Sequence, residues 1–272
     1  MLLQRTLTAL LLAPLAFLAI LLPPTGLFAL VLAAVFLAAL WEWTRLCGLR
    51  NRSARGTLLG VALLAFALLW WLRATLAWPL LLVAGVAWWA LACVWLKHFA
   101  FAAAPTAENR NLKLLAGGFV LFPAFVGLLT LHASEPYGHW WTFLALAIVW
   151  AADIGAYFSG RFLGRRKLAP NISPGKTWAG VYGALVAGAL VAVAGGWLLD
   201  VAGLHLAWLA VLAVLTVAAS VVGDLIESLL KRHAQIKDSG RMFPGHGGLL
   251  DRMDSVFAAV PVFALGKLLL GL

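Results

Sequence analysis

Nine apolar runs occupy most of this chain, and each is about as long as a helix must be to cross the hydrocarbon core of a bilayer. They lie at 7–22, 27–43, 57–72, 76–96, 114–131, 140–158, 178–199, 206–226 and 249–270. Of the 272 residues, 64% are hydrophobic and 11% are charged, and no polar segment is long enough to form a separate soluble domain. The sequence therefore predicts one all-α, polytopic integral membrane domain of about nine transmembrane helices.

The positive charges predict how these helices are oriented. If the N-terminus is cytoplasmic, 18 of the 20 lysines and arginines fall on the cytoplasmic side, as the positive-inside rule requires. Apart from Arg5 they cluster at 45–55, 97–113, 161–176 and 231–252, and an odd number of helices then places the C-terminus in the periplasm. Such loops account for the net charge of +10, so we expect no nucleic-acid partner. Arg50, Arg52 and Arg55 are expected only to orient the chain.

Six acidic residues converge on the cytoplasmic ends of the last four predicted helices. They are Asp153, Asp224, Glu227, Asp238, Asp251 and Asp254. Asp224, Glu227 and Ser228 share one helix face, and an ionisable residue inside a membrane span usually points into a cavity or to a partner. The helix dipole alone accounts equally well for Asp251 and Asp254 at the start of a helix, but not for Asp224 at the end of one. Two acid-bearing helix ends at one face predict oxygen ligands for Mg²⁺ and for phosphates bound to it.

Two glycine-containing segments next to predicted helices are candidates for phosphate binding. Gly245-His246-Gly247-Gly248 precedes the last helix, where backbone N–H groups and the helix dipole attract anions, although an ordinary turn explains the glycines equally well. Ser173-Pro174-Gly175-Lys176-Thr177 precedes another helix. It is not a Walker motif, because Pro170 stands where that motif needs its first glycine and no strand is predicted before it. Its lysine and hydroxyl groups can still hold phosphate.

The polar stretch between the last two predicted helices resembles the signature of phosphatidate cytidylyltransferases (CDP-diacylglycerol synthases). The matching positions are Ser228-x-Leu230-Lys231-Arg232, Lys237-Asp238-x-Gly240 and Phe243-Pro244-x-His246-Gly247-Gly248-Leu249-x-Asp251-Arg252-Met253-Asp254. Asp153-x-Gly155-Ala156-Tyr157-Phe158-x-Gly160-Arg161, Ser173 to Trp178 and Gly223-Asp224-x-x-Glu227-Ser228 also resemble this family. The resemblance covers about residues 145–262, whereas the first 140 residues match only in hydropathy. Ala179 departs from it, because many relatives carry Glu or Gln there.

The resemblance implies a multi-pass enzyme of the bacterial inner membrane that faces the cytoplasm. It implies a reaction of CTP with phosphatidic acid that gives CDP-diacylglycerol and pyrophosphate, with Mg²⁺ as cofactor and a homodimer as the assembly. Residues 1–140 are then a scaffold and dimerisation region of about five spans, and residues 141–272 the catalytic region.

Roles of single residues follow from this resemblance together with the chemistry of the side chains. Asp224 and Asp251 are expected to hold the metal. The expected catalytic group consists of Asp224, Asp251, Asp254, Ser228, Lys237 and Asp238. The expected substrate-binding group consists of Asp153, Ser173, Lys176, Thr177, Lys231, Arg232, His246, Gly247, Gly248 and Arg252.

Two other functions are compatible with parts of this pattern. A related CTP-dependent transferase acting on an isoprenoid alcohol or an ether lipid would share the polar motif. An ion-coupled transporter would need acids near the middle of the bilayer, and the acids here cluster at one end of the predicted helices.

Overall fold

The computed structural model describes residues 14–240, 242 and 247–272. A helical stretch at 14–21 is followed by eight further helices and one two-stranded sheet. The helices are α2 (Thr25–Leu46), α3 (Arg52–Trp71), α4 (Ala77–Lys97), α5 (Ala107–His132), α6 (Gly138–Leu163), α7 (Trp178–Leu198), α8 (Gly203–His233) and α9 (Leu250–Leu270). The strands are β1 (Lys167–Ala169) and β2 (Ser173–Thr177).

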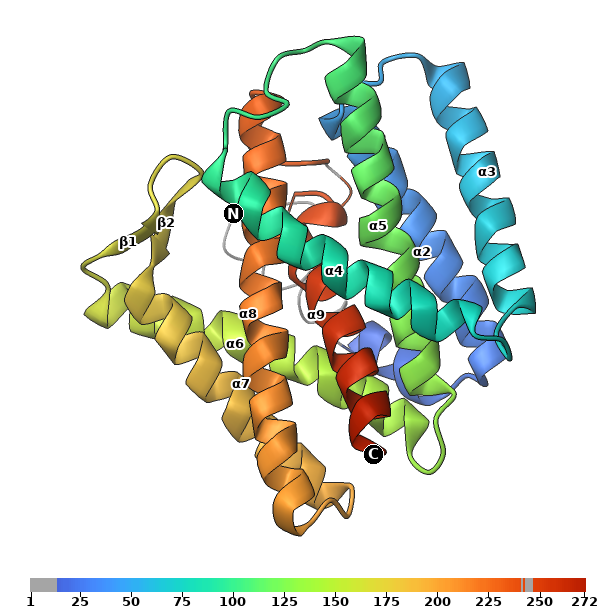
Figure 1. Ribbon diagram of the computed structural model, residues 1–272, viewed down its shortest axis with the longest axis vertical. Helices are drawn as coiled ribbons and strands as arrows, with labels where there is room; N and C mark the ends of the chain where they lie inside the picture. Colours follow the sequence, from blue (N-terminus) through green and yellow to red (C-terminus); the bar gives the residue numbers. More distant parts are fainter. Residues whose placement is uncertain (1–13, 241, 243–246) are drawn as a thin grey trace.

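The predicted fold class is confirmed. Eight helices within the described part of the chain are long and apolar enough to cross a membrane. The first predicted span, 7–22, lies partly outside the described residues, and its described part is helical at 14–21. Figure 1 shows the helices packed side by side as a bundle, with the small sheet projecting at one corner.

The centre of the bundle is held together by aromatic contacts and close helix approaches. Phe36 of α2 packs edge-on against Phe66 of α3, Phe125 of α5 and Phe257 of α9, with ring centroids 5.2–6.2 Å apart. Gly127 of α5 lies so close to α9 that an added Cβ atom would come within 2.7 Å of Val260. Small residues allow this approach in lipid, where dispersion contacts hold helices together. Helices α2, α3, α5 and α9 therefore form one packed unit.

Helices α6, α7 and α8 extend this unit to one side, and α7 packs between α6 and α8 (Figure 1). At Gly183 of α7 an added Cβ atom would overlap the side chain of Ser159, and at Gly155 of α6 it would lie 2.6 Å from the Gly183 carbonyl oxygen. The two helices are thus in backbone contact. This close contact places Asp153, two residues before Gly155, beside the segment that enters α7.

The connection between α6 and α7 contains an antiparallel hairpin that the sequence analysis did not predict. Lys167 of β1 pairs with Thr177 of β2, and Ala169 pairs with Ser173. The Thr177 hydroxyl then accepts a hydrogen bond from Gly180 N at 3.2 Å, which caps the start of α7. Arg232 of α8 donates from Nε to the Ile172 carbonyl at 3.1 Å and fixes the hairpin tip. The hairpin places Lys176 beside α8, where it pairs with Asp224.

Several helices are longer than predicted, and α8 and α5 exceed their predicted spans the most. Helix α8 continues to His233, two turns beyond the predicted end at 226, so Ser228, Lys231 and Arg232 are helical rather than part of a loop. Helix α5 begins at Ala107 instead of 114, because Thr106 caps it through a hydrogen bond from Asn109 N at 3.3 Å. Charged residues at these ends are polar enough to mask the helix in a hydropathy scan, but they do not prevent helix formation.

The four cation-rich connections meet at one end of the bundle. His233 Nε2, at the end of α8, hydrogen-bonds to the Phe99 carbonyl after α4 at 2.7 Å. Arg232 contacts the hairpin, and residues after α2, α4 and α8 line a common cavity. At the opposite end, His132 bonds to Thr25 and His139 to the Leu21 carbonyl. The shared location of the basic loops agrees with the charge pattern, while their orientation toward the cytoplasm stays a prediction.

Candidate active site

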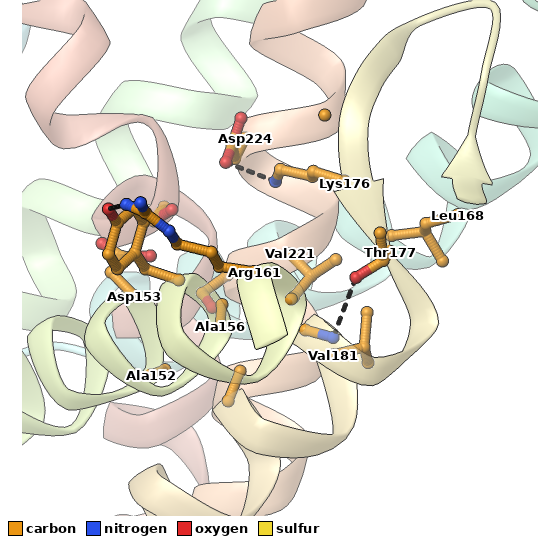
Figure 2. Close-up of a pocket in the computed structure, with 17 residues that line it drawn as sticks. Ala152, Asp153, Ala156, Arg161, Leu168, Lys176, Thr177, Val181, Val221 and Asp224 are labelled. Atoms are coloured by element: carbon orange, nitrogen blue, oxygen red, sulfur yellow. Dashed lines mark hydrogen bonds and ion pairs between the residues drawn. The ribbon is translucent and has the colours of Figure 1, made fainter. Parts of the chain in front are cut away.

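A cavity of about 410 Å³ opens between α6, α7, α8 and the hairpin. Figure 2 shows Asp153 from α6, Lys176 and Thr177 from β2, and Asp224 from α8 on its wall. Lys176 forms an ion pair with Asp224, and both side chains stay partly exposed, at 25% and 30%. The remaining wall is largely apolar and includes Ala152, Ala156, Val181, Ala184 and Val221. The cavity therefore combines charged side chains, which can bind a charged group, with apolar side chains, which can contact a hydrophobic group.

The polar face of α8 is built by helical periodicity. Glu227 and Ser228 follow Asp224 by three and four residues, and Lys231 follows Glu227 by four, so these side chains lie on one face. Ser228 Oγ donates to Asp224 Oδ1 at 3.3 Å. Lys231 forms ion pairs with Glu227 of the same helix and with Asp251 of α9. A line of charged side chains thus runs from the cavity at Asp224 to Asp251 at the start of α9.

Asp251 connects α9 to the polar segment that follows α8. Its Oδ2 atom accepts hydrogen bonds from Ser239 N at 3.0 Å, Ser239 Oγ at 2.9 Å and Gly248 N at 2.7 Å. Its Oδ1 atom accepts from Lys231 Nζ at 2.8 Å. The side chain is 7% exposed, and these donors use about all of the lone-pair sites that a carboxylate offers. In this structure Asp251 organises the segment and does not line the cavity.

Asp254 of α9 lies next to the part of α8 that carries Asp224. Gly223, next to Asp224, lies against the Asp254 backbone carbonyl so closely that a Cβ atom would overlap it. The carboxylates of Asp153 and Asp254 each interact electrostatically with Asp224, and the charge of Arg252 acts on Asp153. Three helices thus contribute one carboxylate each to the surroundings of the cavity.

The remaining predicted residues are dispersed around this core. Arg232 holds the hairpin tip, Ser173 begins β2, and Gly248 donates to Asp251. Gly247 has φ +83°, and a Cβ atom there would lie 2.8 Å from Asp251 Oδ2, which explains the glycine. Lys237 and Asp238 are exposed in the polar segment. His246 lies outside the described residues.

Glu42 of α2 belongs to this site, and the sequence analysis missed it. Its Oε2 atom accepts hydrogen bonds from Leu250 N at 2.8 Å and from Ser239 Oγ at 3.0 Å. Gly240 and Gly248 both pack against its carboxylate, where a Cβ atom would overlap it. At 5% exposure, Glu42 is a buried charge that is satisfied by the polar segment. The sequence does contain a signal for Glu42, because an acidic residue between two tryptophans inside an apolar run indicates a buried polar contact.

The donor set fits a hard divalent cation only in part. Asp153 and Asp224 line a space large enough for phosphates, Asp254 lies near enough to interact electrostatically with Asp224, and Asp224 is directly paired with Lys176. Within residues 14–240, 242 and 247–272, however, no three acid, His or Cys side chains are grouped closely enough to hold a metal by themselves. The side chains therefore suit an ion such as Mg²⁺ that takes part of its ligands from a substrate phosphate.

A membrane-embedded transferase for phosphorylated substrates is the class of protein that this fold and this site define. The chain belongs to the cytidylyltransferase family, whose model matches residues 3–269, and it is a nucleotidyltransferase.

Individual relatives narrow the comparison. The chain is 39% identical to phosphatidate cytidylyltransferase of Haemophilus influenzae, over 97% of this chain and 98% of that protein. It is 42% identical to phosphatidate cytidylyltransferase of Pseudomonas aeruginosa, over 97% and 96% of the two chains. A protein of the same name from Brucella suis is 47% identical over 55% of each chain. The first two matches include the N-terminal helices, for which the sequence analysis found a resemblance to the family in hydropathy only.

Proposed function

We propose that this protein transfers the cytidylyl group of CTP to phosphatidic acid and forms CDP-diacylglycerol and pyrophosphate. The observation that carries the proposal is the cavity between α6, α7 and α8, where the Lys176–Asp224 pair lies next to apolar walls. Phosphatidic acid has this same division into a phosphate and two acyl chains. The two relatives that match 97% of the chain carry the name of this activity.

The chemistry requires little more than positioning and charge. An oxygen of the phosphatidic acid phosphate attacks the α-phosphorus of CTP, the bond to the β-phosphate breaks, and pyrophosphate leaves with that bond's electron pair. The attacking phosphate is already ionised near neutral pH, so no strong general base is needed. Lys176 at the cavity is placed to hold phosphate oxygens as negative charge builds. Lys231, which is paired with Glu227 and Asp251 in this structure, is the second candidate for this role.

Mg²⁺ bound beside Asp224 would neutralise the CTP phosphates and polarise the reacting phosphorus. Asp224 is the carboxylate that faces the cavity, and Asp251 is the second expected ligand. Before Asp251 can also bind the metal, its Oδ1 atom must lose the hydrogen bond from Lys231. We therefore propose that Lys231 turns from Asp251 toward the substrate phosphates when CTP binds.

The proposed place of the reaction is the cytoplasmic face of a bacterial inner membrane. CTP is a cytosolic compound and the lipid lies in the bilayer, so the site must reach both phases. The cavity lies at the end of the bundle where the cation-rich connections meet, which agrees with that requirement.

Purified protein in detergent micelles tests the proposed function. Pyrophosphate release should require CTP and phosphatidic acid together, and mass spectrometry should detect CDP-diacylglycerol. An isoprenoid alcohol or an ether-linked lipid added in excess should compete weakly. If the protein turns over the isoprenoid alcohol or the ether-linked lipid but not phosphatidic acid, it is the related CTP-dependent transferase instead.

A further inference from the structure

A second, basic cavity of about 630 Å³ lies at the same end of the bundle and shares no lining residue with the active-site cavity. Its walls come from the end of α2 and the turn after it, the start of α3, the α4–α5 connection with α5, and the end of α8 with the residues that follow. Arg45, Arg50, Arg55, Lys113 and His233 line it, and none of its described lining residues is acidic. The cavity therefore has a strong excess of positive charge.

Lys113 is the buried member of this cluster. The residue is 5% exposed, lines the cavity, and has no acidic partner among the described residues. The neighbouring Cys47 cannot serve as its counter-ion, because burial raises the pKa of that thiol to about 12. The Nζ atom is not among the fully buried side-chain atoms without a partner, so the ammonium group is accessible although the rest of the side chain is buried. A charge in such a largely buried place without a counter-ion should favour the binding of an anion.

The turn that follows α2 has a defined backbone conformation, and it positions the arginines on this side of the cavity. Gly48 ends α2 with φ +81°, and Gly48 N and Leu49 N donate to the carbonyls of Arg45 and Thr44, both at 3.0 Å. This is a Schellman motif, which fixes the path of the chain between Arg45 and Arg50. Trp43 Nε1 donates to the Lys113 carbonyl at 2.9 Å and locks the same turn onto α5.

The five basic residues do not have equal roles. Arg55 is committed to α2, because it donates to Thr44 Oγ1 at 2.8 Å and its guanidinium lies 3.4 Å from the centre of the Trp41 ring. His233 holds the Phe99 carbonyl. Arg45 and Arg50 are exposed at the cavity and form no ion pair within the described part of the chain. Their guanidinium groups and the Lys113 ammonium are the groups available to a ligand.

We infer that Arg45, Arg50 and Lys113 form a second phosphate-binding site, separate from the site of cytidylyl transfer. Guanidinium groups match phosphate oxygens with two parallel hydrogen bonds, and the Lys113 ammonium adds a point charge. The ligand is a phosphate-bearing anion, and it can be either the headgroup of an anionic phospholipid or a soluble phosphate compound. For Arg50 this differs from the expectation that it only orients the chain.

Binding measurements on full-length protein with two probes test this inference. Pyrophosphate is titrated into protein in detergent, and phosphatidylglycerol is offered in nanodiscs of phosphatidylcholine, with retained lipid measured by native mass spectrometry. Both experiments are done with Lys176→Ala as background, to weaken phosphate binding in the active-site cavity. Binding of phosphatidylglycerol alone identifies a lipid site, and binding of pyrophosphate alone identifies a soluble ligand.

The variants show whether the named residues hold the ligand. The double change Arg45→Gln/Arg50→Gln should weaken binding at least about tenfold, and Lys113→Gln should do the same. Arg52→Gln is the matched control, because Arg52 is exposed in the same segment but does not line the cavity, and it should change binding less than about twofold. If Lys113→Gln fails to fold, the binding measured for Arg45→Gln/Arg50→Gln decides whether the inference holds. The inference is wrong if neither probe binds, or if Arg52→Gln weakens binding as much as the arginine pair does.

Discussion

Glu42 connects the N-terminal helices to the polar segment that carries the signature residues. It receives hydrogen bonds from Leu250 N and Ser239 Oγ, although Ser239 is 197 residues away in sequence. Since Ser239 also donates to Asp251, a single hydroxyl group bridges the acid of α2 and the acid of α9. Glu42 thus positions Ser239 and the start of α9, which hold Asp251, without itself lining the cavity.

Replacing Glu42 with Ala should lower turnover by about tenfold or more, because the buried Leu250 N–H loses its acceptor at about 1–3 kcal/mol and the link from α2 to Ser239 is lost. Glu42→Gln should retain more activity, since its amide oxygen can still accept one bond. Turnover is measured well below the unfolding temperature of every variant, so that lost stability alone does not lower it. Glu108→Gln, at an exposed acid on α5, should have no effect. Equal activity of Glu42→Ala and wild type would show that Glu42 does not position the segment.

Lys231 neutralises two buried carboxylates at once, Glu227 and Asp251. Lys231→Met should therefore destabilise the protein by about 3 kcal/mol or more, since it leaves unpaired charges in the interior. Adding Glu227→Gln should recover part of that stability but none of the activity, because the charge that we propose to bind phosphate is still missing. Thermal unfolding and pyrophosphate release, measured on the same samples, separate the two effects. Recovery of activity together with stability would limit Lys231 to a structural role.

At the scale of elements, hydropathy predicted the helices well and their ends poorly. The apolar runs locate α2 to α9, because a helix in lipid must satisfy its own backbone and present apolar side chains. The ends depend on caps such as Thr106 and on charged turns such as Ser228 to His233, which a hydropathy average cannot resolve. The hairpin at 167–177 has no alternating apolar pattern and is held by Arg232 from a distant helix, so local sequence could not reveal it.

The close contact of α6 with α7 sets the position of the active-site wall. Gly183→Ala should distort it, because the new methyl group would overlap Ser159, and both unfolding temperature and turnover should fall. Gly60→Ala is the matched control on α3, where no atom lies within 4 Å of the added Cβ. That change should leave turnover intact and raise stability by up to about 1 kcal/mol. Unchanged turnover in Gly183→Ala would show that the contact is not needed.

On the scale of the whole molecule, the sequence predicted where the site lies more accurately than what composes it. Acids on separate spans did converge at one end, with Asp153 and Asp224 on one cavity and Asp251 beside Lys231. Pairing of Asp224 with Lys176 rather than with Asp251 depends on the hairpin, and Glu42 enters through a long-range contact. Neither follows from spacing along the chain. The metal, the homodimer and the division at residue 140 stay predictions.

Topology is a further prediction at this scale. With nine spans and the basic loops inside, the N-terminus is cytoplasmic and the C-terminus periplasmic. Alkaline phosphatase fused to the C-terminus should therefore be active, and green fluorescent protein at the same position should be dark. Fusions within the connection at 47–51 should show the reverse pattern. An inactive phosphatase at the C-terminus would mean that the orientation is inverted or that the number of spans is even.

The most direct test of the active-site assignment is the turnover of Asp224→Asn with CTP and phosphatidic acid at saturating Mg²⁺. Asparagine keeps the shape and a hydrogen-bond acceptor for Ser228, but it removes the charge that faces Lys176 and the proposed metal. We predict a loss on the order of a thousandfold in pyrophosphate release, with the unfolding temperature little changed. Asp200→Asn, at an exposed acid on the opposite end of the bundle, should behave like wild type. Retention of more than about a tenth of wild-type turnover by Asp224→Asn would contradict the assignment of this cavity as the site of cytidylyl transfer.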